Sequence, residues 1–350
     1  MTINKRHHAF ICSTLIALFA CARLPCTAQT ASPSETRQRT VNQSPTPMPS
    51  PTPPMQTRAP IITGTQPAPT TTTTAPPTAP ALTASVPAAI LTTGVAISAA
   101  QQNSRLKFNL DWSFGGRQQR GWYLYTALIN RETGTEKDAF TTDFAFAVAR
   151  WQTANNLAVT GVLDADAWYR MIAVWQARRI QEQDRAEATP SQLLTAPIID
   201  FYDPTRAIEL LKVEKQTYAA YKRMVAAAGQ DLSLKLQIAS NGELSIAEKR
   251  LKIISSFRSK DYQAQLRRQS PNAGRAGLAL NSPHFTGRAL DLYVGGEPVD
   301  TRDFNRSVQI NTPVYKWLVK NAARFGFYPY YYEPWHWEYI PPGSAIVGSQ

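Results

Sequence analysis

The few histidines of this chain constrain its fold more than any other feature. The 350 residues include four histidines, of which two lie at the N-terminus and two, His284 and His336, lie near the C-terminus. Each of the later two stands a few positions from a carboxylate, Asp291 and Glu333 respectively. A fold that uses both imidazoles at one site has to place these two separate segments side by side.

The spacing within each segment predicts strands with one interruption. His284 and Asp291 are an odd number of residues apart, so on a continuous strand their side chains would face opposite sides of the sheet. We therefore predict a break near Gly287 and a strand over residues 288–293. In the second segment a proline disfavours helix before the histidine, and residues 336–340 are predicted to form another strand.

These residue types together indicate a metal site. A zinc enzyme commonly has three protein ligands and one open position for water. His284, Asp291 and His336 can supply three ligands for one zinc ion per chain, which leaves Glu333 free to act as a base. A serine–histidine site would need a spare histidine, and none remains. Taken singly, each histidine also has a simpler interpretation, as a packed side chain whose hydrogen bonds are satisfied.

The first 28 residues have the composition of a secretory signal peptide. Two basic residues precede an apolar run over residues 9–22, and small residues follow up to Ala28. All three cysteines lie in this leader, so the exported protein is expected to have neither a disulfide nor a thiolate metal site. An anchor that is never removed is the alternative, although the run is short for a membrane span. A lipid on Cys21 would also tether the protein to a membrane.

The charge of the chain favours an anionic environment. The leader contains three of the 37 basic residues and no acidic residue, so its removal leaves 34 bases against 25 acids, a formal charge of +9. Such an excess suits a cell wall or a membrane surface. Because no basic stripe with interleaved aromatic residues is present, nucleic acid is not expected as a partner. We expect a monomer in the periplasm or cell envelope.

Residues 29–101 are predicted to be a disordered linker. They are rich in proline, threonine, alanine and serine, and such a segment cannot bury enough apolar surface to offset the entropy of ordering. A tether between a membrane and the wall and a spacer with no further task both fit this composition.

Residues 106–179 are predicted to form a small all-α domain. Thr142 and Asp164 are placed to cap two of its helices. The residues at 146–152 and 156–168 resemble the peptidoglycan-binding domain found on many wall hydrolases. The resemblance implies that this domain binds peptidoglycan, with most of its aromatic residues in the core.

Residues 201–342 are predicted to form an α+β domain with a small, mostly antiparallel sheet. A connector at 180–200 precedes the domain and a tail at 343–350 follows it. A long helix is expected over residues 204–229, and a buried strand is expected over residues 251–257.

Four ordered motifs lie in this domain. They are Ser255–Ser259, Ser282–Asp291, the Trp317–Ala322 run with Gly326 and Phe327 after it, and Glu333–His336. Together they resemble the motifs of the zinc D-alanyl-D-alanine carboxypeptidases of the VanY-like type. By position, the resemblance implies zinc ligands at His284, Asp291 and His336, a catalytic base at Glu333, and a substrate-steadying residue at Arg258. A surface ion pair is the alternative role for the arginine.

Two further positions bear on the substrate. Ser282 is a candidate to orient His284 or to bind the substrate, and a serine that only forms the turn is the alternative. Glu338 departs from the family pattern, because family members often carry an arginine there. Only residues 328–332 separate the last two motifs, where the family often has a longer stretch. These departures leave the chemistry intact and the substrate preference open.

The leading hypothesis is an exported zinc peptidase that removes the terminal D-alanine from peptidoglycan stem peptides. A peptidoglycan D,D- or L,D-endopeptidase, which would use the same chemistry, is one alternative. A non-catalytic cell-wall-binding protein on a hydrolase scaffold is another. The presence of Glu333 argues against this last hypothesis, because an inactive descendant would be free to lose the base.

Overall fold

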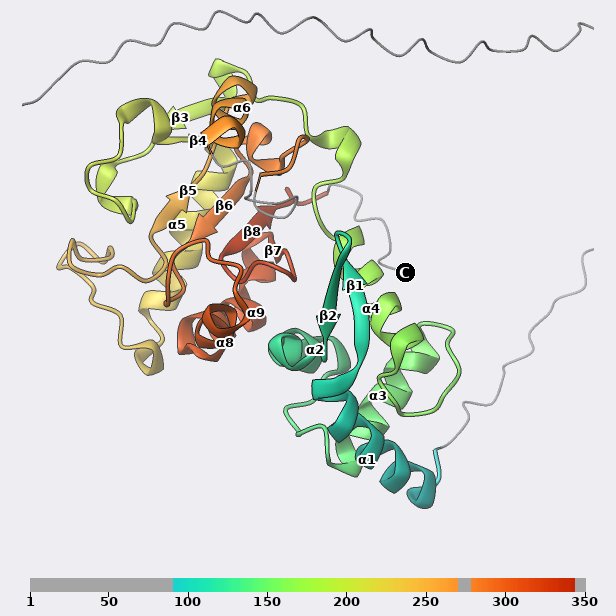
Figure 1. Cartoon of the computed structure of the whole chain (residues 1–350). Coiled ribbons are helices and arrows are strands. Elements are labelled where there is room, and N and C mark those ends of the chain that lie inside the picture. Colours follow the sequence, from blue (N-terminus) through green and yellow to red (C-terminus); the bar gives the residue numbers. More distant parts are fainter. Residues whose placement is uncertain (1–90, 270–277, 344–350) are drawn as a thin grey trace, which may run out of the picture. The chain divides into compact units, whose positions relative to one another are not determined.

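The computed structural model of the chain describes residues 91–269 and 278–343 (Figure 1). The expected signal peptide, Cys21, nearly all of the expected linker and most of the expected tail lie outside these residues. Among the helices of the described ranges, none combines the length and the apolar character that a bilayer span requires.

The N-terminal part of the described chain is mostly helical and also contains one hairpin. Its elements are α1 (Thr93–Asn109), β1 (Asp111–Phe114), β2 (Arg117–Arg120), α2 (Thr126–Thr133), α3 (Thr142–Ala154) and α4 (Ala165–Ala177). We call residues 93–180 the helical segment. Asp164 caps α4 as predicted, since its side chain accepts a hydrogen bond from a backbone N–H of the first turn. The cap of α3 is Thr141 rather than Thr142.

Two predictions for this segment are wrong. Helix α1 begins at Thr93, inside the predicted linker 29–101, because its small residues pack against α3 and the chain beyond it. The buried Asn103 side chain also donates to the carbonyl of Gly161 and accepts from the N–H of Leu163. In addition, the β1–β2 hairpin lies in a region predicted to be all-α. Two glycines with positive φ form its turn, a conformation that favours glycine.

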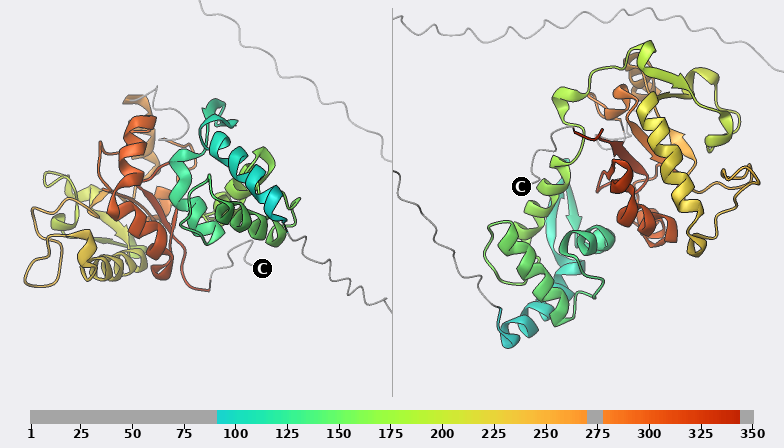
Figure 2. Two further views of the ribbon diagram at one scale, coloured as in Figure 1. Left: turned by 90° about the horizontal axis from the view of Figure 1, so that it is seen from below. Right: turned by 180° about the vertical axis from the view of Figure 1, so that it is seen from behind.

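The C-terminal part is an α+β domain, as predicted. Its main sheet is antiparallel and has four strands in the order β5–β6–β8–β7 (Figure 1). The strands are β5 (Ile253–Ser255), β6 (Ala289–Leu292), β7 (Phe327–Pro329) and β8 (His336–Tyr339). The helices are α5 (Lys215–Gly229), α6 (Lys260–Gln269), α8 (Asp303–Asn311) and α9 (Pro313–Asn321). Seen from behind in Figure 2, α5 lies across one face of this sheet. The fully buried Trp337 of β8 packs against the Tyr315 ring of α9.

The helix predicted over residues 204–229 is wrong in its first half. The chain instead forms β4 (Lys212–Glu214), and α5 begins only at Lys215. The carboxylate of Glu214 caps α5 by accepting two backbone N–H groups, so the helix starts at the residue after it. Strand β4 pairs with β3 (Leu193–Thr195), which brings the end of the predicted connector into a second small sheet.

The helical segment and the α+β domain share a core of aromatic residues. The rings of Tyr125 and Trp175 lie 5.7 Å and 6.0 Å from the ring of Tyr331. Arg306 of α8 donates to the Tyr125 hydroxyl, and its guanidinium lies 4.3 Å from the centre of the Tyr332 ring. The two parts of the chain are therefore packed directly against each other rather than joined only through a connector.

Candidate metal centre

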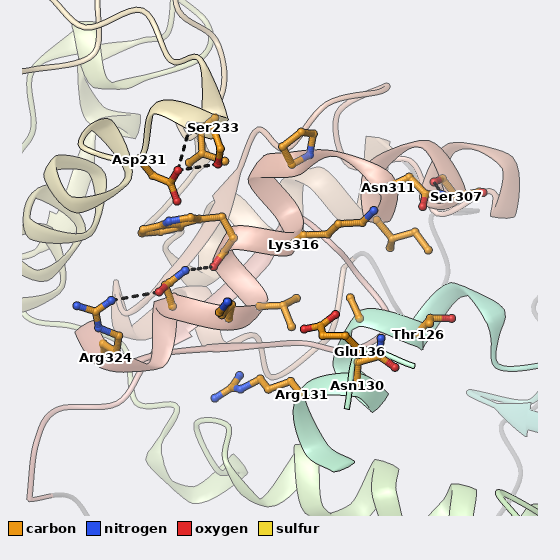
Figure 3. A pocket seen from close by; sticks show the side chains of 18 of the residues that line it. Thr126, Asn130, Arg131, Glu136, Asp231, Ser233, Ser307, Asn311, Lys316 and Arg324 are labelled. Atoms are coloured by element: carbon orange, nitrogen blue, oxygen red, sulfur yellow. Dashed lines mark hydrogen bonds between the residues drawn. The ribbon is translucent and has the colours of Figure 1, made fainter. Parts of the chain in front are cut away.

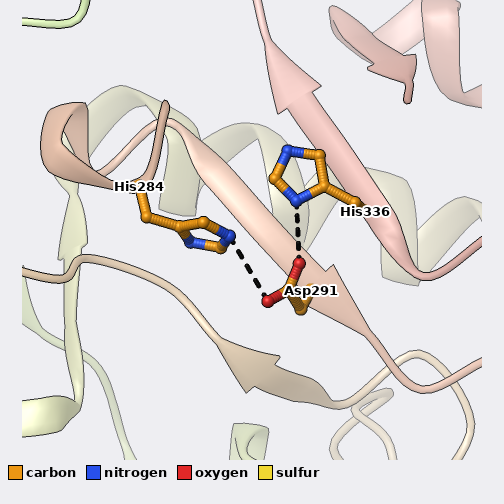
Figure 4. Close-up of side chains that lie close together, drawn as sticks. All are labelled: His284, Asp291 and His336. Atoms are coloured by element: carbon orange, nitrogen blue, oxygen red, sulfur yellow. Dashed lines mark hydrogen bonds and ion pairs between the residues drawn. The ribbon is translucent and has the colours of Figure 1, made fainter. Parts of the chain in front are cut away.

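The pairing of β6 with β8 brings the two histidine segments together (Figure 4). Asp291 lies opposite His336 in this pair of strands. His284 lies on a 3-10 turn, Pro283–Thr286, directly before β6. Gly287 ends this turn with a φ of 66°, which is the break that the odd spacing predicts. A β-carbon at this position would also come within 3.0 Å of the Glu214 backbone nitrogen, so close packing favours glycine as well.

The three candidate ligands meet around one point. One candidate donor atom from each of His284, Asp291 and His336 lies within 4.8 Å of the other two, and all three residues are buried. The Nδ1 atom of His336 lies 2.8 Å from Oδ1 of Asp291, and the Nε2 atom of His284 lies 3.3 Å from Oδ2. The structure therefore brings together the residues that the sequence predicted as a ligand set.

The outer nitrogen of each imidazole is held by a hydrogen bond. Nδ1 of His284 lies 2.6 Å from the main-chain oxygen of Ser256, and Nε2 of His336 lies 3.1 Å from Oε1 of Glu338. Both acceptors are oxygens, so each of these nitrogens carries the proton and donates it. The inner nitrogens then face the Asp291 carboxylate. This orientation by outer hydrogen bonds is typical of histidines that bind metals.

The charges at this point fit a cation. Burial and the neighbouring Arg258 lower the pKa of His284 to about 4, so its ring is neutral. Its Nε2 has no hydrogen-bond partner in the described structure and faces a carboxylate that cannot donate to it. Although burial disfavours a charged ring, hydrogen bonds to Asp291 and Glu338 raise the pKa of His336 to about 9. The inner nitrogen of His336 therefore carries a proton in the metal-free protein. A metal ion that replaced this proton would bind both imidazoles and the Asp291 carboxylate.

Glu333 stands beside this cluster in a form suited to proton transfer. The turn before β8 holds its backbone, because its N–H donates to Tyr330 and its carbonyl accepts from the N–H of His336. Its side chain is buried, and Oε1 has no hydrogen-bond partner among the described residues. Burial raises the pKa of Glu333 to about 7. A carboxylate with this pKa can both accept and return a proton near neutral pH.

The two predicted substrate residues both lie at the site. Arg258 is buried, with Nη2 3.5 Å from Oδ2 of Asp291 and Nη1 donating to Gln263, so the alternative of a surface ion pair is wrong. The hydroxyl of Ser282 accepts a hydrogen bond from the backbone N–H of His284. It therefore forms the turn that presents this imidazole, and its contact with a substrate stays a prediction.

The sequence did not lead us to expect the environment of Glu338. This carboxylate is fully buried and accepts hydrogen bonds from the guanidinium of Arg179 and the backbone N–H of Ile180. Burial opposes its charge, but Arg179 and His336 lower the pKa of Glu338 to about 2. Arg179 follows α4, so the helical segment helps to orient a metal-site imidazole. One sequence signal for this contact was available. Glu338 stands where similar proteins often carry an arginine, and a buried glutamate needs a cation from another part of the chain.

The site opens into a pocket of about 140 Å³. Glu333, both imidazoles and three arginines line it, namely Arg179, Arg185 and Arg258. A much larger cleft of about 1340 Å³ is lined by α2, α9 and the chain after α5 (Figure 3). No histidine lines this cleft. Since the chemistry requires the convergent ligands and the base, we assign the candidate site to the smaller pocket.

Comparison with known families agrees with this geometry. Residues 210–342 match the VanY family model, D-alanyl-D-alanine carboxypeptidase. The matched region contains the four-stranded sheet, the candidate ligands, Glu333 and Arg258. The VanY match supports a hydrolytic enzyme of the carboxypeptidase type that acts on peptidoglycan. The match begins at residue 210, after the helical segment and the connector, so Arg179 and Arg185 lie outside it. A peptidoglycan-binding domain at 106–179 stays a prediction. A search of curated proteins found no match to this chain.

Proposed function

We propose that the protein is an exported zinc metallopeptidase that hydrolyses the terminal D-alanyl-D-alanine bond of peptidoglycan stem peptides. The observation that carries the proposal is the meeting of two imidazoles and one carboxylate within 4.8 Å, beside a buried glutamate that lacks a partner in the described structure. The VanY match supports the substrate class and the carboxypeptidase type.

His284, Asp291 and His336 would hold the zinc ion through Nε2, the carboxylate and Nδ1. When bound, zinc supplies Lewis acidity, which acidifies water and polarises a carbonyl group. Ser256 and Glu338 keep the outer imidazole nitrogens protonated, so the inner nitrogens present lone pairs.

Glu333 would move the proton. Its free Oε1 accepts a proton from the attacking water, and the same carboxyl returns it to the leaving amine of D-alanine. A pKa of about 7 suits both transfers, because neither protonation state is strongly favoured near neutral pH. Arg258 would donate hydrogen bonds to the scissile carbonyl as negative charge develops on its oxygen. Burial lowers the pKa of Arg258, but a guanidinium still keeps its charge in the neutral range.

The remaining parts of the proposal concern location. A signal peptide at residues 1–28 would direct export to the periplasm or cell envelope, and Cys21 is the candidate site for a lipid anchor. Residues 106–179 would bind peptidoglycan and hold the monomeric enzyme near its substrate. The basic charge of the chain supports an anionic surrounding of this kind.

The test combines metal analysis with product analysis on purified muropeptides. We expect one zinc per chain and the loss of a single alanine from pentapeptide stems, as measured by mass spectrometry. Glu333→Gln should keep its zinc and release no D-alanine, because the amide cannot accept the proton. D-alanine release by this variant would contradict the mechanism. Larger fragments would indicate an endopeptidase, and binding to sacculi without any product would indicate a wall-binding protein.

A further inference from the structure

The three arginines that line the catalytic pocket differ in their partners. Arg258 faces Asp291 at 3.5 Å, and Arg179 is paired with the buried Glu338. Arg185 forms no ion pair with any described residue. Its guanidinium instead donates to main-chain carbonyls, with Nε and Nη2 bonded to Ile180 and Nη1 bonded to Asn281. It is the one cation of this pocket without a carboxylate within ion-pair distance in the described structure.

These hydrogen bonds hold Arg185 in place and leave donors free. Each terminal nitrogen of a guanidinium carries two hydrogens, and the structure uses one on each. One N–H on Nη1 and one on Nη2 remain, so each terminal nitrogen still has a hydrogen that it can donate to a carboxylate oxygen. The bond to Asn281, which directly precedes Ser282, ties the guanidinium to the turn that presents His284.

We infer that Arg185 binds the C-terminal carboxylate of the substrate. This inference rests on the proposed function and deepens it, because it assigns the group that recognises a chain end. A peptide bound with its last carbonyl near Glu333 has its free carboxylate one residue further on, in the same small pocket that Arg185 lines. Neither Arg179 nor Arg258 is equally available, since each already faces a buried carboxylate.

Arg185 would therefore set the choice between chain ends and internal bonds. An internal peptide bond presents a neutral amide where the chain end presents an anion, and a half-buried cation discriminates strongly between the two. The connector at 180–200 is thus part of the substrate site, although it precedes the region that matches the carboxypeptidase family.

The test compares two peptides that both end in D-alanyl-D-alanine, one as the free acid and one as the C-terminal amide. The wild-type protein should cleave the acid with a kcat/KM about 10- to 100-fold above that for the amide, the range expected for a charge-assisted hydrogen bond. Arg185→Gln should lose this preference, mainly through a higher KM for the acid, with little change for the amide. Arg185→Lys should recover part of it, because the charge remains. Arg178→Gln is the matched control, since Arg178 pairs with Glu132 in the helical segment, and it should keep the preference.

A binding measurement separates this inference from the proposed function. In a Glu333→Gln background, which prevents turnover, calorimetry should show tighter binding of the acid than of the amide only when Arg185 is present. Equal binding of acid and amide, or an equal loss for both peptides in Arg185→Gln, would overturn the inference. If the wild-type protein cleaves neither peptide, the proposed function fails, and the calorimetric preference alone then decides whether Arg185 binds a carboxylate.

Discussion

Replacing Arg179 with glutamine removes the main counter-charge of Glu338, the carboxylate that orients His336. Glu338 is fully buried, and the Arg179 side chain is only 11% exposed. Removing one partner of a buried ion pair costs several kcal/mol, because the other charge is left uncompensated. Since Glu338 keeps its hydrogen bonds to Ile180 and His336, we take the lower end, about 3 kcal/mol of unfolding free energy. For a folded region of about 250 residues this corresponds to a fall in Tm of about 6 to 12 °C.

The same substitution should weaken zinc binding. Without Arg179 the Glu338 carboxylate loses a hydrogen-bond donor that fixes its position. Its hydrogen bond to Nε2 of His336 then holds the imidazole ring less firmly. Loss of such an outer partner typically lowers metal affinity about 10- to 100-fold. Competition with a chromophoric chelator measures this affinity, and thermal melting of the zinc-free protein measures the stability.

The neighbouring arginine supplies the control. Arg178→Gln breaks an ion pair with Glu132 inside the helical segment, so it should lower stability without changing zinc affinity. A second variant, Arg179→Met combined with Glu338→Gln, removes both charges and should regain much of the stability. Zinc affinity unchanged in Arg179→Gln, or lowered equally in Arg178→Gln, would refute the claim that the helical segment orients the metal ligand.

Three further predictions follow from individual contacts. Gly287→Ala should cost at least about 1 kcal/mol and weaken zinc binding, because the residue has a φ of 66° and the added carbon would meet Leu193; an unchanged Tm would contradict this. Zinc affinity should rise roughly tenfold per unit between about pH 6 and pH 8, because zinc displaces a proton from His336, whose pKa in the metal-free fold is about 9. Since that pKa is raised above the ordinary value, this imidazole stabilises the zinc-free protein fully at low pH and loses its contribution as the pH rises through about 9, which zinc-free melts would show. Asn103→Ala should cost about 2 kcal/mol and raise hydrogen exchange in α1, and normal protection there would show that α1 docks without this side chain.

The sequence predicted the convergence of the candidate ligands because the features that position each of them lie within a few residues of it. The odd spacing of His284 and Asp291 requires a break, and Gly287 is the residue that permits it. The register of β6 against β8 then places Asp291 and His336 opposite each other. The cap at Asp164 and the antiparallel sheet followed from the same kind of short-range pattern.

Elements stabilised by distant contacts were not predicted. Helix α1 is held by contacts with residues distant in the sequence, since its alanines pack against Ala145 and Val162 and its Asn103 side chain bonds to the chain after α3. Arg179 and Arg185 reach the pocket of the candidate site from outside the matched domain, and no spacing rule connects them to His336. Glu338 was the one local indication, since a buried carboxylate needs a cation that its own neighbours do not supply.

X-ray absorption spectroscopy of the zinc-loaded protein tests the central claim most directly. We predict one zinc per chain, with scattering from two imidazole rings at about 2.0 Å and additional oxygen donors. In His336→Ala one imidazole contribution should disappear. A zinc spectrum without histidine scattering, or a protein that fails to retain zinc at neutral pH, would contradict the account.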